Sequence, residues 1–175
     1  MVKIVMDAGH GGFDAGASYE GRLEKDDVLR LTLAVGEILR ANGIDVIYTR
    51  NADIYETPFQ KATEANQANA DYFVSIHRNS GEIPGQYYGV QSLVYTDEGI
   101  PHKMAEIIDA KLEELGFRNI GIEERKNLVV LKRTAMPAVL VEVGFINAEI
   151  DNHLFDDKFD AVATAIADGI IETIM

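Results

Sequence analysis

Four side chains in this sequence have the chemistry of a hydrolytic metal centre. His10 follows an apolar segment and opens a glycine-rich stretch, and His77 follows a second apolar segment. Glu24 stands at the start of an amphipathic segment, and Glu142 lies inside a third apolar segment. Two imidazoles and one carboxylate form a known catalytic zinc ligand set that leaves one coordination position open for water. The remaining carboxylate would then transfer protons, which indicates a metal-dependent hydrolase.

Each of these residues also has a purely structural interpretation. A single histidine after a strand is more often hydrogen-bonded than a ligand, and a glutamate in the first turn of a helix interacts favourably with the helix dipole. Glu142 is harder to explain in this way, because a carboxylate among apolar neighbours is costly to bury without a partner. By chemistry alone either glutamate could be the ligand, but a strand holds Glu142 rigidly and suits a group that must be aimed. The other two histidines, His102 and His153, have polar neighbours and are expected at the surface.

Short apolar segments alternate with longer amphipathic ones, which is typical of an α/β fold with a largely parallel sheet. We expect strands at 2–6, 44–49, 71–76, 89–96, 128–131 and 138–143, and helices at 23–41, 58–70, 101–115 and 159–174. The connections between them are expected to be irregular, and 78–89 is a plausible rim of a binding cleft. Ligands of open α/β sheets bind beyond the carboxyl ends of the strands. His10, His77 and Glu142 lie at or near such ends, so we expect them to converge.

Composition limits the possible partners and compartments. The 175 residues suffice for about one domain, and the formal charge of −13 argues against nucleic acid and anionic membranes as partners. There are no cysteines, which excludes disulfides and thiolate zinc sites. We find neither a signal peptide nor an apolar stretch of the roughly 20 residues that spans a bilayer, so we expect no membrane insertion. The expected product is made in the cytoplasm without an export signal of its own.

The glycines around His10 do not form a phosphate-binding loop. Gly9, Gly11, Gly12 and Gly16 fit neither the dinucleotide-binding nor the P-loop spacing. With a histidine inside the turn, we expect these glycines to let the backbone wrap closely around a metal ligand.

The segment 7–17, Asp-Ala-Gly-His-Gly-Gly-Phe-Asp-Ala-Gly-Ala, resembles the opening motif of the zinc-dependent N-acetylmuramoyl-L-alanine amidases of the Amidase_3 type. The resemblance continues in the order and spacing of that family through Glu24-Lys25, Thr49-Arg50, Ala65-Asn66, Ala70-Asp71, Ser75-Ile76-His77 with Asn79, and Pro137 to Phe145. It extends from residue 2 to the last helix.

The resemblance implies a single three-layer α/β domain over residues 1–175, with a mostly parallel six-stranded sheet flanked by helices. It implies cleavage of the amide between N-acetylmuramic acid and L-alanine in bacterial peptidoglycan. His10, Glu24 and His77 match the zinc ligands, and Glu142 matches the catalytic glutamate. The chain is then similar to the catalytic domain of a phage endolysin or autolysin, expected to be monomeric and to act on the wall after release. A C-terminal wall-binding domain, where present, would lie outside this chain.

Some positions depart from the family pattern. Arg78 stands where a small residue is common, and Arg78 and Asn79 are our candidates for substrate binding. Arg78 would bind a carboxylate of the stem peptide or merely lie on the rim. Lys61 replaces an arginine, with little expected consequence, and segment 120–122 is less basic than usual, which leaves its substrate contact open. We see no segment for an autoinhibitory helix, so the site is expected to be open.

Two alternatives remain from the residues alone. A zinc peptidase that cuts within the stem peptide could use the same ligand set. A non-catalytic peptidoglycan-binding module could keep the fold, but the presence of all four chemical residues disfavours it.

Overall fold

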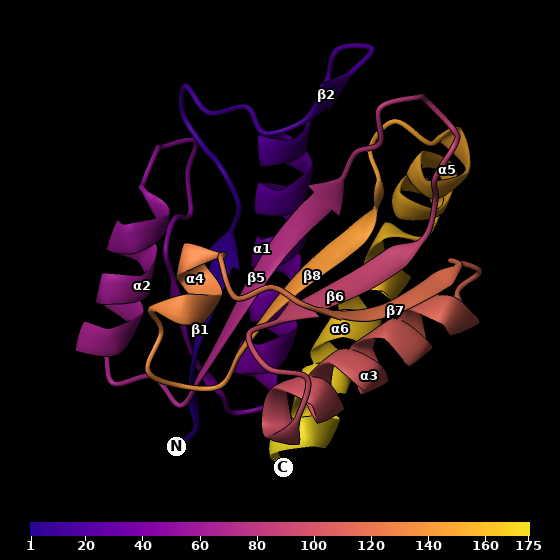
Figure 1. The fold of residues 1–175 in the computed structure, drawn as a ribbon. Helices are drawn as coiled ribbons and strands as arrows, with labels where there is room; N and C mark the ends of the chain where they lie inside the picture. The colour runs from indigo at the N-terminus through magenta and orange to yellow at the C-terminus, as the bar shows by residue number, and fades with distance from the viewer.

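A six-stranded sheet between two layers of helices forms the molecule in the computed structural model, which describes residues 1–175 (Figure 1). The strands of the sheet, in the order β4-β1-β5-β8-β6-β7, are Asp45–Tyr48, Lys3–Ala8, Tyr72–Asn79, Ala138–Phe145, Val90–Val94 and Asn119–Glu124. Neighbouring strands are parallel except for β6 and β8, which pair antiparallel. The predicted single α/β domain with a mostly parallel sheet is confirmed.

The helices divide between the two faces of the sheet. They are α1 (Glu24–Ala41), α2 (Pro58–Gln67), α3 (Gly99–Glu114), α4 (Val129–Lys132), α5 (Glu149–Asp157) and α6 (Phe159–Ile174). The larger apolar core joins α1, α3 and α6 to one face, and a smaller core joins α2 and α4 to the other. On this second face α2 and α4 lie over the β1 and β5 side, and Leu93 of β6 belongs to the same core as Val130 and Leu131 of α4 (Figure 1).

Helix α1 shows why the sequence folds in this way. Val28, Leu31, Val35 and Leu39 recur at three- and four-residue spacing, and all four are fully buried. Each buried side chain of this size stabilises the fold by roughly 1.5–3 kcal/mol before the entropic cost is counted. The first turn carries three acidic residues where the helix dipole favours them, and Gly43 ends the helix region with a φ of 79°. The first residue of this helix is Glu24, so the packing of α1 places a candidate ligand.

The prediction was wrong in one region of the sheet. Segment 128–131, expected to be a strand, overlaps the helix α4, and the sixth strand is instead β7, which lies in the segment 117–127 that we expected to be irregular. Periodicity cannot separate a strand from one helical turn in a run of four apolar residues. Helix α5 and the small hairpin of β2 (Ser18–Tyr19) and β3 (Arg22–Leu23) were also not predicted.

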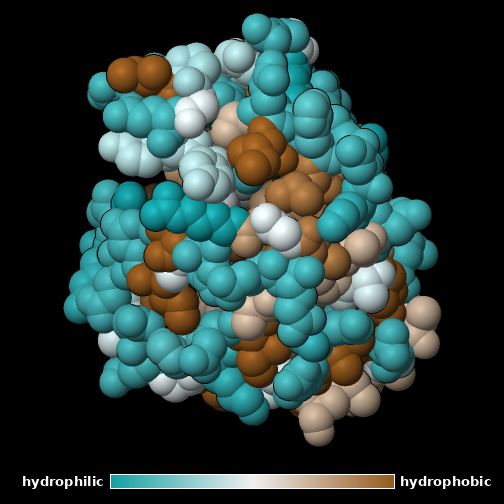
Figure 2. All heavy atoms as spheres, turned by 90° about the vertical axis from the view of Figure 1, so that its right-hand side faces the viewer, coloured by the Kyte–Doolittle hydropathy of each residue, from teal (hydrophilic) through white to brown (hydrophobic).

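Both chain ends lie at the bottom of the view in Figure 1, whereas β1 and β5 end at the top. On the side of the molecule drawn in Figure 2, hydrophobic residues form separate patches between hydrophilic ones. None of the helices is long and apolar enough to cross a membrane.

Candidate metal and catalytic site

His10, Glu24 and His77 meet at the carboxyl ends of β1 and β5. One ligand atom from each residue can be chosen so that all three lie within 4.8 Å of one another. Glu24 Oε1 lies 3.1 Å from His10 Nε2 and 3.1 Å from His77 Nδ1. The two imidazole rings stand edge to face, with centroids 4.9 Å apart. The predicted convergence of the two histidines is thus found in the structure, and Glu24 joins them.

Two glycines allow this close approach. A Cβ on Gly9 would lie 2.3 Å from His77 Cε1, and a Cβ on Gly16 would lie 2.6 Å from Glu24 Oε2. His10 itself has a φ of 62°, in the left-handed region, which costs a residue with a side chain about 1–2 kcal/mol. The glycines therefore wrap the backbone around the candidate ligands, as predicted, and the fold maintains a strained histidine at their centre.

Asp14, which sequence reasoning did not select, orients His10. Its Oδ2 lies 2.9 Å from His10 Nδ1, which keeps the proton on Nδ1 and leaves Nε2 free to face Glu24. Burial lowers the pKa of His10, but hydrogen bonds with Glu24 and Asp14 raise it to about 9. The position of Asp14 four residues after His10, in a loop, was the only signal in the sequence.

Glu24 is held as a carboxylate from several sides. The backbone amides of Ala17 and Arg78 donate to Oε2 and Oε1, at 2.8 and 3.0 Å. Burial alone would raise the pKa of Glu24, but its contacts with His10 and His77 hold it well below its ordinary value. A charged carboxylate between two imidazoles suits a divalent cation.

Glu142 stands beside this cluster on the neighbouring strand. It is in register with His77 in the parallel pairing of β5 and β8, so both side chains are on the same face of the sheet. Its Oε2 is buried and has no hydrogen-bond partner. Burial, moderated by the nearby His77, raises the pKa of Glu142 to about 7. This carboxyl group can therefore both accept and release a proton near neutral pH.

A buried ion pair between Lys61 and Asp7 lies beside the two histidines and lines the same cavity. Lys61 Nζ lies 2.8 Å from Asp7 Oδ1 and donates to Ala8 O at 2.7 Å. Asp7 also accepts hydrogen bonds from Thr49 and Ser75, both at 2.6 Å. The Lys61 ammonium neutralises a fully buried carboxylate and contacts the strand end that leads to His10, and the expectation that lysine in place of arginine has little consequence stays a prediction. Arg50 donates to the same carbonyl.

The prediction that Arg78 binds substrate was wrong. Successive residues of a strand point to opposite faces of the sheet, so Arg78 points away from the face of His77. Its side chain is 0% exposed, donates to Asp27 Oδ2 at 2.7 Å and to Asn152 Oδ1 at 2.8 Å, and lies over the Phe155 ring.

Asn79 lies two residues beyond His77 and is partly exposed. Its Oδ1 accepts from Ser80 N at 2.9 Å, and its role in substrate binding stays a prediction. His102 and His153 lie at the surface, as expected.

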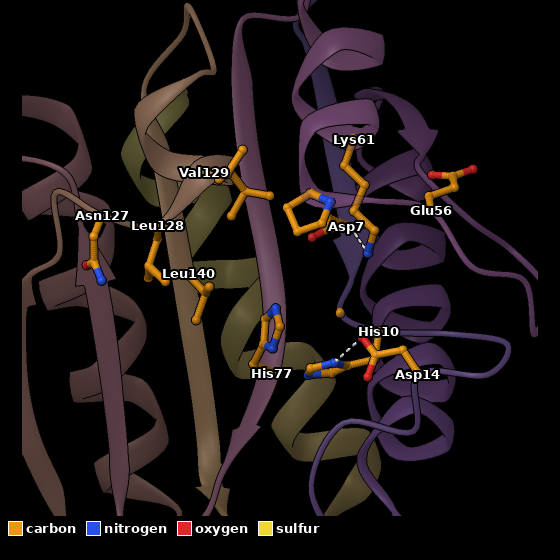
Figure 3. Close-up of a pocket in the computed structure, with 13 residues that line it drawn as sticks. Asp7, His10, Asp14, Glu56, Lys61, His77, Asn127, Leu128, Val129 and Leu140 are labelled. Carbon is orange, nitrogen blue, oxygen red and sulfur yellow. Dashed lines mark hydrogen bonds and ion pairs between the residues drawn. The ribbon is translucent and has the colours of Figure 1, made fainter.

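A cavity of about 280 Å³ adjoins the two histidines (Figure 3). Figure 3 shows His10 and His77 at one end, with Glu56 and Lys61 on one side and Leu128, Val129 and Leu140 on the other. The side chains of His10 and His77 are 24% and 19% exposed, so solvent reaches them. The cluster is therefore accessible to a ligand.

Comparison with known proteins identifies relatives over nearly the whole chain. The profile of the family described as N-acetylmuramoyl-L-alanine amidase, Amidase_3, matches residues 4–172. A sporulation-specific N-acetylmuramoyl-L-alanine amidase of Bacillus subtilis is 36% identical over 97% of this chain and 67% of its own length. The endolysin of Bacillus phage SPP1 is 36% identical over 98% of this chain and 66% of its own length.

Solved structures of related proteins superpose on this one. The structure of the N-acetylmuramoyl-L-alanine amidase AmiC2 of Nostoc punctiforme superposes with a TM-score of 0.90 at 32% identity, and the match covers 98% of this chain and 96% of that one. The chain thus spans about two thirds of the length of the two sequence relatives.

Proposed function

Because the chain belongs to the Amidase_3 family of N-acetylmuramoyl-L-alanine amidases, we propose that it hydrolyses the amide between N-acetylmuramic acid and L-alanine in bacterial peptidoglycan. We further propose that His10, Glu24 and His77 hold a zinc ion and that Glu142 transfers the proton. The observation that carries the proposal is the convergence of these three donors beside a buried carboxyl oxygen without a partner.

The donor set fits zinc. Imidazole nitrogens and a carboxylate oxygen bind zinc at about 2.0–2.2 Å, which separates tetrahedral donors by about 3.3 Å. Glu24 Oε1 lies 3.1 Å from one nitrogen of each histidine. Bound zinc would polarise the substrate carbonyl and lower the pKa of a water molecule towards ~7.

The residues of the chain then perform the proton transfers. The Glu142 carboxylate accepts a proton from the attacking water, whose oxygen bonds to the lactyl carbonyl carbon. The protonated Glu142 next donates to the amide nitrogen, the carbon–nitrogen bond breaks, and a carboxylate and the amino group of L-alanine leave. A pKa of about 7 suits both steps, because the group is neither too weak a base nor too weak an acid at neutral pH. Asp14 keeps His10 in the tautomer that presents Nε2.

One chain supplies all four residues, so the proposed site needs no second copy, and we propose that the enzyme is monomeric. We propose that the monomer acts on the bacterial wall after release from the cell that makes it. Light scattering of the purified protein would test the oligomeric state.

Purified peptidoglycan tests the reaction directly. We expect mass spectrometry of the products to show free lactyl carboxyl groups and a new L-alanine amino terminus. Chelation should abolish hydrolysis, and added zinc should restore it. A new terminus within the stem peptide would instead identify a peptidase, and chelator-insensitive wall association without a product would identify a binding module.

A further inference from the structure

The line of polar side chains that contains His77 and Glu142 continues across two more strands. Gln91 on β6 is directly opposite Glu142 in the antiparallel pairing of β6 and β8, so their side chains share a face. Gln91 Nε2 donates to Glu123 Oε2 on β7 at 3.1 Å, and Arg125 Nε donates to Glu123 Oε1 at 2.6 Å. Arg125 is thus connected to the neighbourhood of Glu142 through two side chains.

Arg125 differs from the other arginines near the site. Arg78 is buried against Asp27, and Arg50 donates its hydrogen bonds to backbone carbonyls. Arg125 uses only Nε, whereas its two terminal nitrogens have no hydrogen-bond partner and its side chain is 43% exposed. The Glu123 contact fixes the direction of the guanidinium without using the pair of nitrogens that binds a carboxylate in bidentate fashion.

The surroundings of Arg125 are open and acidic. The side chains of Arg125 and Glu123 are both 43% exposed, so a molecule in solvent can reach the guanidinium. The site itself contains the carboxyl groups of Asp14, Glu24 and Glu142, in a chain with a formal charge of −13. A substrate carboxylate near Glu142 would be repelled unless a cation met it, and the charges of Arg125 and Glu142 interact.

We propose that Arg125 binds the carboxylate of the substrate nearest to the scissile bond, the α-carboxylate of the second stem residue. This inference rests on the proposed amidase function. In stem peptides whose second residue is a γ-linked glutamate, that carboxylate follows L-alanine directly, within about 7 Å of the scissile nitrogen. Arg125 therefore makes the enzyme distinguish free from amidated stem peptides.

Two soluble muramyl tripeptides that differ only in whether this carboxyl group is free or amidated test the proposal. With zinc present, we expect the native protein to cleave the free acid with at least about tenfold higher kcat/KM, the size of one charged hydrogen bond. Arg125→Gln should lose this preference mainly through a higher KM for the acid, and leave the amidated substrate unchanged. Arg125→Lys, which keeps the charge but not the planar fork, should retain part of the preference.

Lys126→Gln is the matched control, since Lys126 is the next residue, is 60% exposed and pairs with Glu124. Lys126→Gln should leave the preference for the free acid intact. If it loses as much of the preference as Arg125→Gln does, the preference comes from the overall surface charge and not from Arg125. Equal cleavage of both substrates by the native protein, or an equal loss on both in Arg125→Gln, would overturn the role of Arg125. If the native protein cleaves neither substrate, the amidase function itself fails, and the inference fails with it.

Discussion

Glu142 is a carboxyl group that the fold buries without giving one of its oxygens a partner. Such a group is costly in a folded protein, so its position beside His77 indicates a chemical role. Its pKa of about 7 lets it both accept and release a proton near neutral pH.

Glu142→Gln should keep the shape of the side chain and remove its ability to exchange a proton. We expect hydrolysis to fall by about 10²–10⁴-fold, the usual contribution of such a group. Zinc content by atomic absorption and the melting temperature should remain at native values or higher, because a buried charge is removed. Activity within threefold of native would refute the assigned role.

A substitution at Gly9 tests whether metal binding requires the close approach of the backbone to His77. In Gly9→Ala the new Cβ would lie 2.3 Å from the imidazole, so we expect the ring to move and zinc affinity to fall at least tenfold. Competition titration with a chelating dye would measure it. Gly81→Ala is the control, since its Cβ would come nearest to the Tyr87 side chain, at 3.2 Å, and should leave the affinity unchanged.

At this scale the sequence predicted the residues that converge but not those that orient them. His10, His77 and Glu142 could be selected because each lies at the end of, or inside, an apolar strand segment. Lys61 acts through contacts that no spacing in the sequence reveals, and the only sequence signal for Asp14 was its position four residues after His10. Side chains alternate between the two faces of the sheet along β5, so Arg78 and His77, as successive residues, lie on opposite faces.

A small network of charged side chains connects several helices and strands. Asp27 on α1 accepts from Arg78 on β5 and from Arg22 on β3, and Arg22 also pairs with Asp156 on α5. The network therefore joins α1, which positions Glu24, to β5, which positions His77. The Arg78 guanidinium also lies over the Phe155 ring.

Arg78→Met should break this connection while preserving most of the apolar volume. Because it removes one partner of a buried pair, we expect the free energy of unfolding to fall by about 3 kcal/mol, measured by urea denaturation. Arg40→Met on α1 is the control, since its pair with Glu37 is at the surface and should contribute less than about 1 kcal/mol. Equal effects of the two changes would contradict the network's role.

The long elements were predictable, and the short ones were not. Helices α1 and α6 repeat their apolar spacing over several turns, and β1, β5 and β8 each contain a run of at least four consecutive buried residues. The short helix α4 overlaps segment 128–131, and its Val130 and Leu131 belong to the smaller core. Strand β7 lies at the edge of the sheet and contains Gly121 and two glutamates, so it lacks the apolar pattern of a strand.

The stability of the whole molecule should depend on pH through a buried acid on the opposite face of the sheet from Glu142. Asp109 on α3 is 1% exposed and accepts from Ser92 N and Oγ on β6. Burial raises the pKa of Asp109 to about 7. Since the folded pKa exceeds the unfolded one, its contribution is complete below about pH 4 and is lost as the pH rises through 7.

Asp109→Asn should remove this dependence. Between pH 5 and pH 8 the native protein should lose about 3 kcal/mol relative to the variant, because each pKa unit corresponds to about 1.4 kcal/mol. Chemical denaturation at several pH values would measure the difference. Asp168→Asn, at an exposed position on α6, should run parallel to the native protein, and a parallel course for Asp109→Asn would contradict the assignment.

The two chain ends lie opposite the carboxyl ends of β1 and β5 (Figure 1). A linker at either end, or a tag used to fix the protein to a bead or sensor chip, would therefore present His10 and His77 outwards. Immobilised in this way, the enzyme could meet a whole bacterial surface without steric obstruction by its own attachment. The same arrangement would let engineered binding modules for different walls be fused at either end without altering the sheet.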